Sequence, residues 1–532
     1  MLKRYAIGLD FGTLSVRALL VDIETGRELA TAVSEYPHGV MDKALPNGMK
    51  LPEGFALAHP QDYVDGLRSV VPQIIRDAGI TGYDVAGIGL DCTSATVMPV
   101  NAEGTPLCLL PEWAGHPHAY LKLWKHHGGD PQARRMLKTA QERNEPWLNF
   151  CGGGIQCELL LPKALETAEM DPAVWSACHW YLEMGDWLAW YLTGRNCRSL
   201  SMASCNGYYR PPAGYPSDDY WRAVSPGIEP VTSRLLGKLL PLDGVAGYLT
   251  PKIADELTLP PGTPVAVPLI DSHASVVGCG ADRAGDMVAV LGTSACYLMN
   301  DNVQMGIPGI YSVAYEAHVP GLYGYEGGQS CLGDGLDWFV RQCVPARVQA
   351  EADDTGESVH TLLSRKAALM RPGESGLIAL DWLNGVRSPL MRPDLRGVLV
   401  GATLKTTPAD LYRAVVEASC FGARRIIDSF QEAGVPVKRV FATGGIPRKN
   451  PFLMQVLADV CGKEIGVCQS SQASALGSAI MGAAASGEGL NECIRRMAAP
   501  VDIIYKPNQA EAYEALYKRY RALSMVFEQI QQ

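Results

Sequence analysis

The feature that most constrains the fold of this chain is a series of short apolar runs, each of which stops at an acidic residue or a glycine. The runs AIGL, VAGIGL, PVAVPLI, MVAVL and VFAT begin at Ala6, Val85, Pro264, Met287 and Val440. They stop at Asp10, Asp91, Asp271, Gly292 and Gly444. Such runs are typical of buried strands in a helix-covered α/β sheet. Ligands gather at the carboxyl ends of such strands.

Helical patterns lie between the expected strands. Thr407-Pro408 predicts the N-cap and first turn of a helix, and Gly434 lies just beyond its end. At 532 residues the chain is too long for one ordinary core. LDFGT at Leu9 has a weak echo in VLGTS at Val290, so we expect two similar α/β domains. The turn-rich stretch 257–264 predicts a boundary that gives domains 1–260 and 261–532.

Composition excludes several classes of protein. The net charge of −10 argues against a general nucleic-acid binder. No uncharged apolar run reaches 18 residues, so no membrane helix is expected, and Asp10 interrupts the first run too early for a signal peptide. The 15 cysteines are scattered without a CxxC motif. This pattern favours reduced thiols in the cytoplasm, with redox or metal use as the alternative.

The first strand and the residues after it predict a site for phosphate and a metal ion. Gly12 lets the backbone approach a ligand closely, while Thr13, Ser15 and Arg17 supply hydrogen-bond donors and a positive charge. Asp10 can hold Mg²⁺ through water, because magnesium prefers oxygen ligands and keeps several waters. A tight β-hairpin with Arg17 on a solvated face is the alternative.

Three motifs, in the same order, resemble those of the FGGY family of sugar kinases. They are LDFGTLSVRA from Leu9, VAVPLIDSHASVVGCGA with the following AVLGTSACYL from Val265, and FATGGIPRKNPFLMQVLADV from Phe441. The resemblance covers essentially the whole chain. It implies two ribonuclease-H-like domains of the actin and hexokinase type that flank a catalytic cleft. The first domain would bind the sugar and part of the phosphates, and the second would carry the catalytic aspartate and ATP.

The resemblance also implies that ATP and Mg²⁺ are used, and it implies which residues contact the nucleotide. These residues are Gly12, Thr13, Ser15 and Arg17 in one domain, and Gly292, Thr293, Gly328, Gln329, Gly444, Gly445 and Asn450 in the other. Backbone N–H groups of such glycine turns bind anions. Asn450 either touches the adenine base or caps the helix that begins near Pro451.

Asp271 is the expected catalytic base, because it would accept the proton of the sugar hydroxyl that attacks the γ-phosphorus of ATP. With Asp10 it is also the expected metal ligand, the two carboxylates coming from opposite domains. The alternative for Asp271 is a helix N-cap. His273 is interpreted as a packed residue rather than a base.

Within the family, GIGLDCTSAT, LWKHH, YEGGQSCLGDGLDWF and DWLNGVRSP are most similar to the ribulokinases. The similarity implies that Ser94, Trp124, Asn206, Asp271 and Glu326 contact the sugar, although Trp124 could instead be a core residue. Ribulokinases often carry a lysine where this chain has Asn206. The expected reaction is the conversion of L-ribulose to L-ribulose 5-phosphate in L-arabinose catabolism, with D-ribulose, xylulose or erythritol as alternative substrates.

Two other classes remain open at this point. An actin- or chaperone-like ATPase would use nucleotide to drive partner binding, and a sugar-sensing regulator would keep the fold without catalysis. The resemblance favours a sugar kinase and implies a homodimer. No nucleic-acid or membrane partner is expected.

Overall fold

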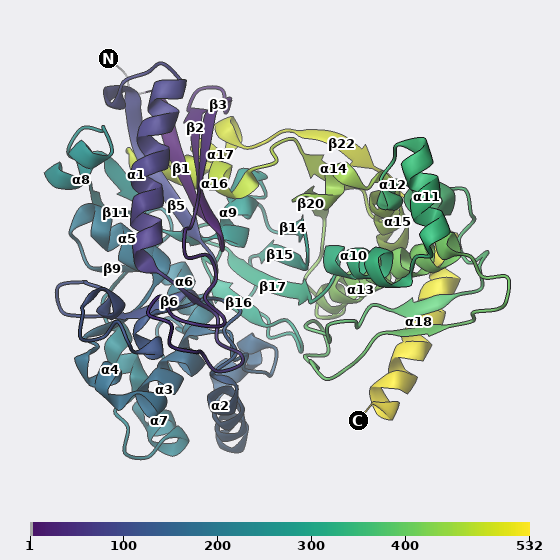
Figure 1. The fold of residues 1–532 in the computed structure, drawn as a ribbon, viewed down its shortest axis with the longest axis horizontal. Helices are drawn as coiled ribbons and strands as arrows, with labels where there is room; N and C mark the ends of the chain where they lie inside the picture. Colours follow the sequence, from purple (N-terminus) through teal and green to yellow (C-terminus); the bar gives the residue numbers. More distant parts are fainter. Residues whose placement is uncertain (1–3, 532) are drawn as a thin grey trace. The chain divides into compact units, whose positions relative to one another are not determined.

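The computed structural model describes residues 4–531, which form two compact units (Figure 1). The first contains the residues up to Asp282, Val313–Gly324 and Gln472–Ala499. The second contains Arg283–Ser312, Tyr325–Ser471 and the residues from Pro500 onward. The expected boundary at 260/261 is therefore wrong. The segment after it supplies strands to the sheet of the first unit, and the chain returns to that unit twice more.

The first unit is built on a mixed seven-stranded sheet with the order β11-β12-β5-β1-β2-β3, in which β13 also pairs with β5. Its strands are β1 (Tyr5–Phe11), β2 (Ser15–Asp22), β3 (Glu28–Glu35), β5 (Val85–Cys92), β11 (Val245–Tyr248), β12 (Pro264–Ala266) and β13 (Leu269–Ile270). Strands β1 and β13 both run parallel to β5, so these three end at one edge of the sheet. The predicted strands at 6, 85 and 264 are confirmed, the last of them divided in two.

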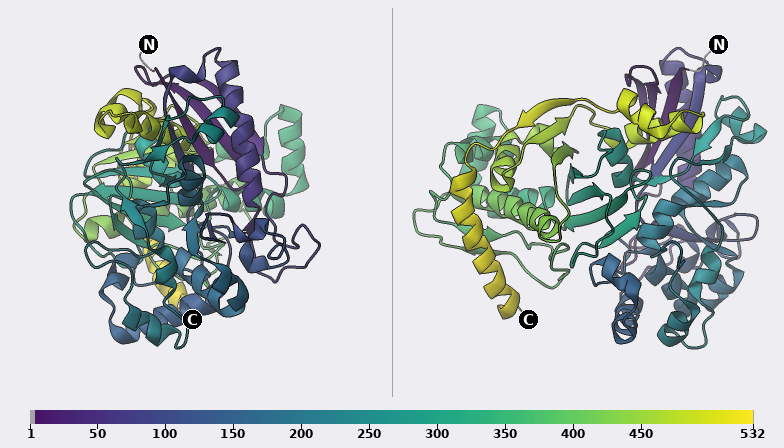
Figure 2. Two further views of the ribbon diagram at one scale, coloured as in Figure 1. Left: turned by 90° about the vertical axis from the view of Figure 1, so that its left-hand side faces the viewer. Right: turned by 180° about the vertical axis from the view of Figure 1, so that it is seen from behind.

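Helices cover both faces of this sheet (Figures 1 and 2). Helix α1 (Pro60–Asp77) packs on β2 and β3, and α16 (Ala473–Ala485) packs on β1 and β5. A Cβ atom at Gly8, Gly87 or Gly89 would lie 1.8, 2.1 or 1.8 Å from a backbone oxygen of α16. Glycine at these positions therefore allows the helix backbone to rest directly on the strands.

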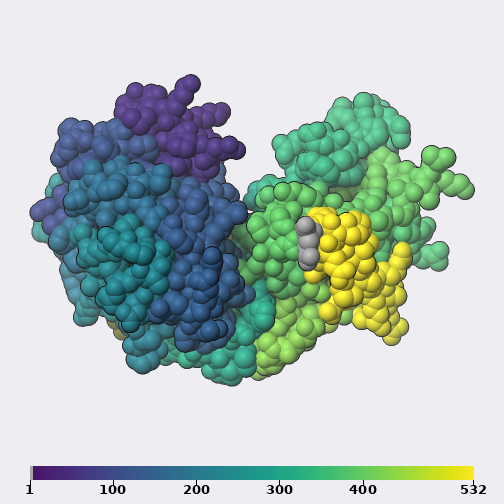
Figure 3. All heavy atoms as spheres, turned by 90° about the horizontal axis from the view of Figure 1, so that it is seen from below, coloured from purple at the N-terminus to yellow at the C-terminus, as the bar shows by residue number. Residues whose placement is uncertain are grey.

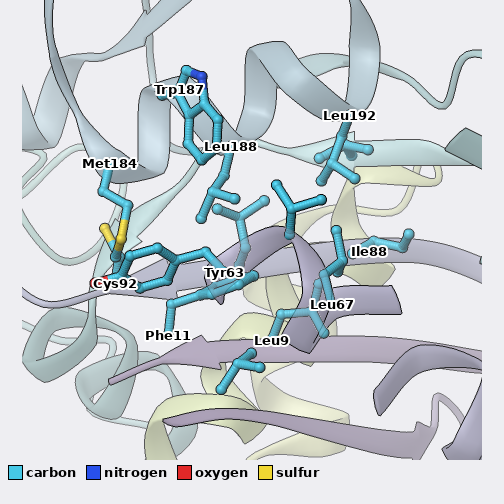
Figure 4. Packing of buried hydrophobic residues seen from close by; sticks show 14 of the residues in the cluster. Leu9, Phe11, Tyr63, Leu67, Ile88, Cys92, Met184, Trp187, Leu188 and Leu192 are labelled. Atoms are coloured by element: carbon cyan, nitrogen blue, oxygen red, sulfur yellow. The ribbon is translucent and has the colours of Figure 1, made fainter. Parts of the chain in front are cut away.

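The opposite face of the sheet holds the main hydrophobic core, seen in Figure 4. Side chains from three elements meet there: the strands, α1 and α5 (Met184–Thr193). The cluster includes Leu9, Phe11, Ile88, Cys92, Tyr63, Leu67, Met184, Trp187, Leu188 and Leu192, all buried. Because side chains alternate along a strand, burying Leu9 and Phe11 on this face turns Asp10 toward α16.

The rest of the first unit surrounds a four-stranded sheet with the order β4-β7-β6-β8 and a two-stranded sheet, β10-β9. The strands are β4 (Leu57–Ala58), β6 (Val97–Val100), β7 (Leu121–Lys122), β8 (Trp180–Glu183), β9 (Cys197–Ser199) and β10 (Lys238–Leu240). The helices are α2 (Asp130–Arg143), α3 (Leu160–Met170), α4 (Pro172–Ala177), α6 (Leu200–Asn206), α7 (Asp218–Val224), α8 (Pro251–Glu256), α9 (Asp271–Gly278) and α17 (Leu490–Met497).

The second unit repeats the arrangement around β1, β2 and β5. Its sheet has the order β16-β17-β15-β14-β20-β21-β22, in which most of β16 and the first two residues of β17 fall within the Val313–Gly324 stretch of the first unit. The strands are β14 (Asp286–Leu291), β15 (Ala295–Asp301), β16 (Ser312–Tyr315), β17 (Tyr323–Gln329), β20 (Arg439–Thr443), β21 (Ile465–Cys468) and β22 (Val501–Tyr505). Each sheet contains an antiparallel hairpin, β1–β2 in the first unit and β14–β15 in the second. The first strand of each hairpin also pairs in parallel with a later strand, β5 or β20. The weak sequence echo thus corresponds to two similar α/β sheets.

Helices and a small hairpin complete the second unit. They are α10 (Gly333–Cys343), α11 (Ala346–Thr355), α12 (Val359–Ala368), β18 (Ile378–Leu380), β19 (Val398–Val400), α13 (Pro408–Glu432), α14 (Ile446–Lys449), α15 (Pro451–Cys461) and α18 (Ala510–Ile530). Helix α13 has the predicted Thr407 cap, and Gly434 follows it with φ +82°. Helix α18, yellow in Figure 3, lies at the surface beside α15. Within residues 4–531, no helix combines the length and apolar character needed to cross a bilayer.

Candidate functional site

Three aspartates converge at one edge of the first sheet. Asp10 pairs in register with Asp91, which also pairs with Leu269, two residues before Asp271. The three carboxylates therefore sit at the carboxyl ends of β1, β5 and β13. Asp10 and Asp271 both belong to the first unit, so the expectation that they come from opposite domains is wrong. The reason is that β13 pairs with β5 instead of starting a new sheet.

Asp91 is the most buried of the three, and it was not among the predicted site residues. Its Oδ2 accepts a 2.6 Å hydrogen bond from the Ser478 hydroxyl of α16, while its Oδ1 has no hydrogen-bond partner among the described residues. Burial, followed by the charge of Asp10, raises the pKa of Asp91 well above its ordinary value, and Asp271 adds to the rise. A repeated tetrapeptide could have revealed this residue, because Ile-Gly-Leu-Asp occurs at both 7–10 and 88–91.

Asp10 lies between acidic and basic neighbours. Burial raises its pKa, whereas its contacts with Asp91 and Arg17 oppose the rise. The Arg17 Nη1 atom is 3.9 Å from Asp10 Oδ2 across the β1–β2 hairpin. The predicted alternative of a tight hairpin is confirmed, with a 3.0 Å hydrogen bond from Gly12 N–H to the Ser15 carbonyl. That hairpin is compatible with an anion site, because Gly12 and Thr13 are only half-buried at its turn.

Asp271 is the first residue of α9, one position inside the N-cap, Ile270. The N-cap alternative is thus wrong by one residue, although Asp271 Oδ1 does accept a 2.7 Å hydrogen bond from Ser272 N–H. Asp271 stays half-buried at the N-terminus of α9. His273 is fully buried, with Nδ1 3.0 Å from the Ala317 carbonyl, as expected of a packed residue.

The predicted sugar residues of the first unit lie around the turn between β5 and β6. The Ser94 hydroxyl donates to Asn206 Oδ1 at 3.1 Å, and Asn206 Nδ2 donates to Glu183 Oε1 at 2.9 Å. Asn206 is 2% exposed, so its amide serves as a bridge between Ser94 and Glu183. Burial raises the pKa of Glu183 to about 8. No local sequence signal had marked Glu183, because only the folded chain brings it to Asn206.

Trp124 connects the sugar residues to the hairpin. Its indole Nε1 donates to Thr13 Oγ1 at 3.1 Å, and the residue is half-buried. This position differs from the alternative of a core tryptophan, since part of the ring stays accessible. Ser94, Trp124, Asn206 and Asp271 all belong to the first unit, while Glu326 lies on β17 in the second, where its Oε1 accepts a 2.7 Å bond from Tyr311.

A glycine-lined edge forms in the second unit. Gly292 follows β14 and Gly444 follows the parallel neighbour β20, with Val290 and Thr443 in register. A Cβ atom at Gly444 would lie 2.5 Å from the Leu291 carbonyl oxygen, and its φ of +99° also favours glycine. The structure thus brings Gly292 and Thr293 beside Gly444 and Gly445, as predicted for a phosphate site.

A pocket of about 970 Å³ lies next to this edge, within the second unit. Its lining includes Gly333, Leu336, Ile446, Asn450, Phe452 and Tyr505. Asn450 caps α15 by accepting a 3.0 Å hydrogen bond from Leu453 N–H. The capping alternative is confirmed, and contact between Asn450 and the base stays a prediction.

Gly328 and Gln329 are engaged elsewhere. Gln329 is buried, and its amide donates to Asp381 Oδ2 at 2.8 Å and to the Ser419 carbonyl at 2.9 Å while accepting from Tyr297. Gly328 N–H donates to Ser388 Oγ at 3.2 Å. These bonds hold β17 against α13 and the 381–388 loop. The structure does not bring either residue to the pocket that Asn450 lines.

Comparison with known proteins agrees with this arrangement. Residues 287–486 match the C-terminal domain of the FGGY family of carbohydrate kinases. The ribulokinase of Bacillus licheniformis is 42% identical over 525 residues, covering 97% of this chain and 95% of the relative. Ribulokinase 2 of Staphylococcus saprophyticus is 37% identical over 523 residues, covering 98% and 96%.

Solved structures share the fold at lower identity. Xylulose kinase from Rhodospirillum rubrum superimposes with a TM-score of 0.81 at 23% identity, covering 99% of this chain and all of that one. Glycerol kinase from Plasmodium falciparum gives 0.74 at 16% identity, covering 98% of each chain. The expected fold class, a pair of actin-type α/β domains, is confirmed. Given a 42% identical relative along nearly its whole length, the chain belongs to the FGGY family of carbohydrate kinases.

Proposed function

We propose that this kinase transfers the γ-phosphoryl group of ATP to L-ribulose, giving L-ribulose 5-phosphate in the cytoplasm as a step of L-arabinose breakdown. The relatives named ribulokinase support the choice of sugar. One observation carries the chemistry: the in-register ends of β1, β5 and β13, which gather Asp10, Asp91 and Asp271 at one sheet edge.

Asp271 is the proposed base. Its half-buried carboxylate accepts the proton of a sugar hydroxyl while that hydroxyl oxygen forms a bond to the γ-phosphorus of ATP. The bond between the γ-phosphorus and the β,γ-bridging oxygen breaks, and ADP is released. In the first unit, Ser94 would hydrogen-bond the sugar and the Trp124 ring would pack against its carbon atoms; in the second unit, Glu326 is the proposed partner of a sugar hydroxyl. Phosphoryl transfer depends mainly on such positioning and on charge neutralisation.

The acidic edge fits a magnesium ion. Carboxylate oxygens are the ligands that Mg²⁺ prefers, and the half-buried carboxyl groups of Asp10 and Asp271 both lie at this edge. Asp10 and Asp271 would hold the ion, which supplies positive charge against the phosphate oxygens when bound. Gly12, Thr13, Ser15 and Arg17 would contact the phosphates from the first unit.

In the second unit, the proposed nucleotide residues are Gly292, Thr293, Gly444 and Gly445. Their backbone N–H groups follow adjacent parallel strands, the position at which phosphate groups bind in α/β sheets. The pocket that Asn450 lines would receive the adenosine. Gly328 and Gln329 have no contact role in this proposal.

A panel of sugars tests the function. ADP release is measured with L-ribulose, D-ribulose, D-xylulose, L-xylulose and erythritol, and we expect the highest kcat/KM with L-ribulose. If ATP were hydrolysed at the same rate in the absence of sugar and in the presence of each sugar tested, the result would contradict a kinase and favour the ATPase alternative. Complete inactivity with preserved sugar binding would favour the regulator.

Asp271→Asn tests the base. The amide cannot accept the proton, so we expect kcat to fall by about 10³-fold or more while ATP binding, measured by calorimetry, stays within a few-fold of wild type. Asp243→Asn, an exposed aspartate of the same unit, is the matched control and should keep full turnover. Retained turnover in Asp271→Asn would remove Asp271 from this role.

A second candidate function is the same reaction on another pentulose or a polyol. The position of Asn206 favours it, because the amide is already bonded to Ser94 and Glu183, whereas ribulokinases often carry a lysine there. The Asn206 amide carries no charge and its hydrogen bonds are already used, so a sugar bound here would contact a different group from the lysine of ribulokinases. Higher kcat/KM with D-ribulose, a xylulose or erythritol would establish this candidate.

A further inference from the structure

A fully buried lysine of α3 joins the two backbone segments that carry Ser94 and Trp124. Lys163 Nζ donates to the Ala95 carbonyl at 2.8 Å and to the Leu123 carbonyl at 2.7 Å. Ala95 follows Ser94, and Leu123 precedes Trp124. Both acceptors are main-chain atoms, so the Nζ atom of Lys163 fixes the path of two loops, whatever their side chains do.

The Ser94 turn needs such support. Ala95 has φ +47°, in the left-handed region, which is strained for a non-glycine residue. The turn is tight, with the hydroxyl groups of Thr93 and Thr96 2.7 Å apart. The hydrogen bond from Lys163 Nζ to the Ala95 carbonyl stabilises this strained conformation from the side of α3.

Other buried groups hold the same turn from the end of β8 and the start of α5. Met184 N–H donates to the Thr96 carbonyl at 2.7 Å, and Glu183 holds the Ser94 hydroxyl through Asn206. The Ser94 turn is thus fixed at its backbone by Lys163 and at its side chain by Glu183. Of the side chains Lys163 and Glu183, Lys163 is the one that also bonds to the Trp124 segment, which pairs with β6 through Lys122 and Val97.

We propose that Lys163 is a positioning residue that sets the spacing between Ser94 and Trp124, and thereby the affinity for the sugar, without touching the sugar itself. The inference rests on the proposed function, in which Ser94 and Trp124 line the sugar site. It predicts a larger effect on the sugar than on the nucleotide, because Lys163 makes none of its side-chain bonds to the proposed nucleotide residues and reaches Thr13 only indirectly, through Trp124.

Lys122 provides a matched control. It is equally buried, and its Nζ donates to Glu166 Oε2 and Thr167 Oγ1, both at 2.7 Å, and to the Lys163 carbonyl at 3.2 Å. All three acceptors lie on α3. Lys122→Met therefore removes a buried amino group that contacts α3 from β7, while the bonds of Lys163 to Ala95 and Leu123 remain.

The experiment compares Lys163→Met and Lys122→Met in the full chain, with the sugar that wild type turns over fastest. KM for sugar and for ATP, kcat and the thermal midpoint are measured. We expect Lys163→Met to raise the sugar KM about tenfold or more with the ATP KM within about twofold, since small displacements of positioning groups have effects of this size. Lys122→Met should lower the thermal midpoint with a much smaller change in sugar KM.

Lys163→Gln is the second variant, because its amide keeps a donor although the side chain is shorter. It should fall between wild type and Lys163→Met in sugar KM, and it keeps the test decisive should Lys163→Met not fold. An unchanged sugar KM in folded Lys163→Gln and Lys163→Met, or equal shifts in the Lys163 and Lys122 variants, would overturn the inference. Wild-type inactivity on every sugar would instead reject the proposed function.

Discussion

At the scale of single residues, Asp10 and Asp91 occupy the last position of two copies of Ile-Gly-Leu-Asp that pair residue for residue in β1 and β5. The two copies differ in accessibility. Asp91 is completely buried and bonded to Ser478, whereas the Asp10 side chain is 19% exposed and faces Arg17. The same local sequence therefore supplies a half-buried carboxylate that a ligand can reach and a fully buried carboxyl group whose raised pKa favours its neutral form.

Glu183 gives a pH-dependent prediction at this scale. Its folded pKa of about 8 lies above the ordinary 4.5, so its contribution to stability is complete below pH 4.5 and is lost as pH rises toward 8. Glu183→Gln cannot ionise and retains an acceptor for Asn206. We expect the urea midpoint of wild type to fall relative to the variant between pH 5.5 and 8.5.

The control for this prediction is Glu103→Gln, an exposed glutamate of the same unit, which should follow the wild-type pH profile. Parallel profiles for wild type and Glu183→Gln would show that the burial of Glu183 does not govern this pH range.

At the scale of elements, the close approach of α16 to β1 and β5 determines how the acidic edge is built. The helix can reach Asp91 through Ser478 only because glycine faces it at Gly8, Gly87 and Gly89. Gly278 of α9 has a similar role, since its Cβ would lie 2.0 Å from the Ala473 carbonyl oxygen. Small residues thus set the distance between sheet and helices at the site.

Gly89→Ala tests this packing. The new methyl would lie 1.8 Å from the Ser478 carbonyl oxygen, so α16 must move away from β5. We expect a loss of about 3 kcal/mol in the free energy of unfolding, the upper range for overpacking, measured by urea denaturation. Gly115→Ala is the control, because its nearest neighbour would be 3.7 Å away. Equal stability of the two variants would show that α16 tolerates the displacement.

At the scale of the whole molecule, each unit is assembled from three separate stretches of chain. The sheet of the first unit takes β12 and β13 from beyond residue 260, and the helix that covers one of its faces comes from 473–485. The family's two-domain fold is therefore not two consecutive halves of the sequence.

A fragment of residues 1–260 is expected not to fold. Without α16, the glycine-rich face of β1 and β5 has no helix to cover it. The apolar surface that β12, β13 and α16 would bury contributes about 25 cal/mol per Å² to the free energy of unfolding, and the fragment lacks this contribution. We expect weak near-ultraviolet circular dichroism and no cooperative urea transition, in contrast to the full chain. A cooperative transition in the fragment would mean that the first unit is complete without these segments.

Much of the fold could be predicted because strand ends and helix caps are local. The runs at Val85, Met287 and Val440, and the Thr407 cap, correspond to β5, β14, β20 and α13. Prediction failed where distant segments meet. Three predictions were wrong: the boundary at 260/261, the origin of Asp10 and Asp271 in different domains, and the position of Gln329 near the nucleotide. Each depends on the order of strands in the sheet, which the periodicity of the sequence does not encode.

By itself, the sequence determined that this chain forms α/β sheets whose strands end in aspartates and glycines, because apolar periodicity and backbone freedom are properties of a few neighbouring residues. Only the tertiary structure decided that Asp91 joins Asp10 and Asp271, that Asn206 bridges Ser94 to Glu183, and that Lys163 ties two loops together. Such contacts join residues that are far apart in the sequence: Ser478, which bonds to Asp91, lies 387 positions from it. Buried polar groups must find partners, and which partners are available is settled only when the whole core packs.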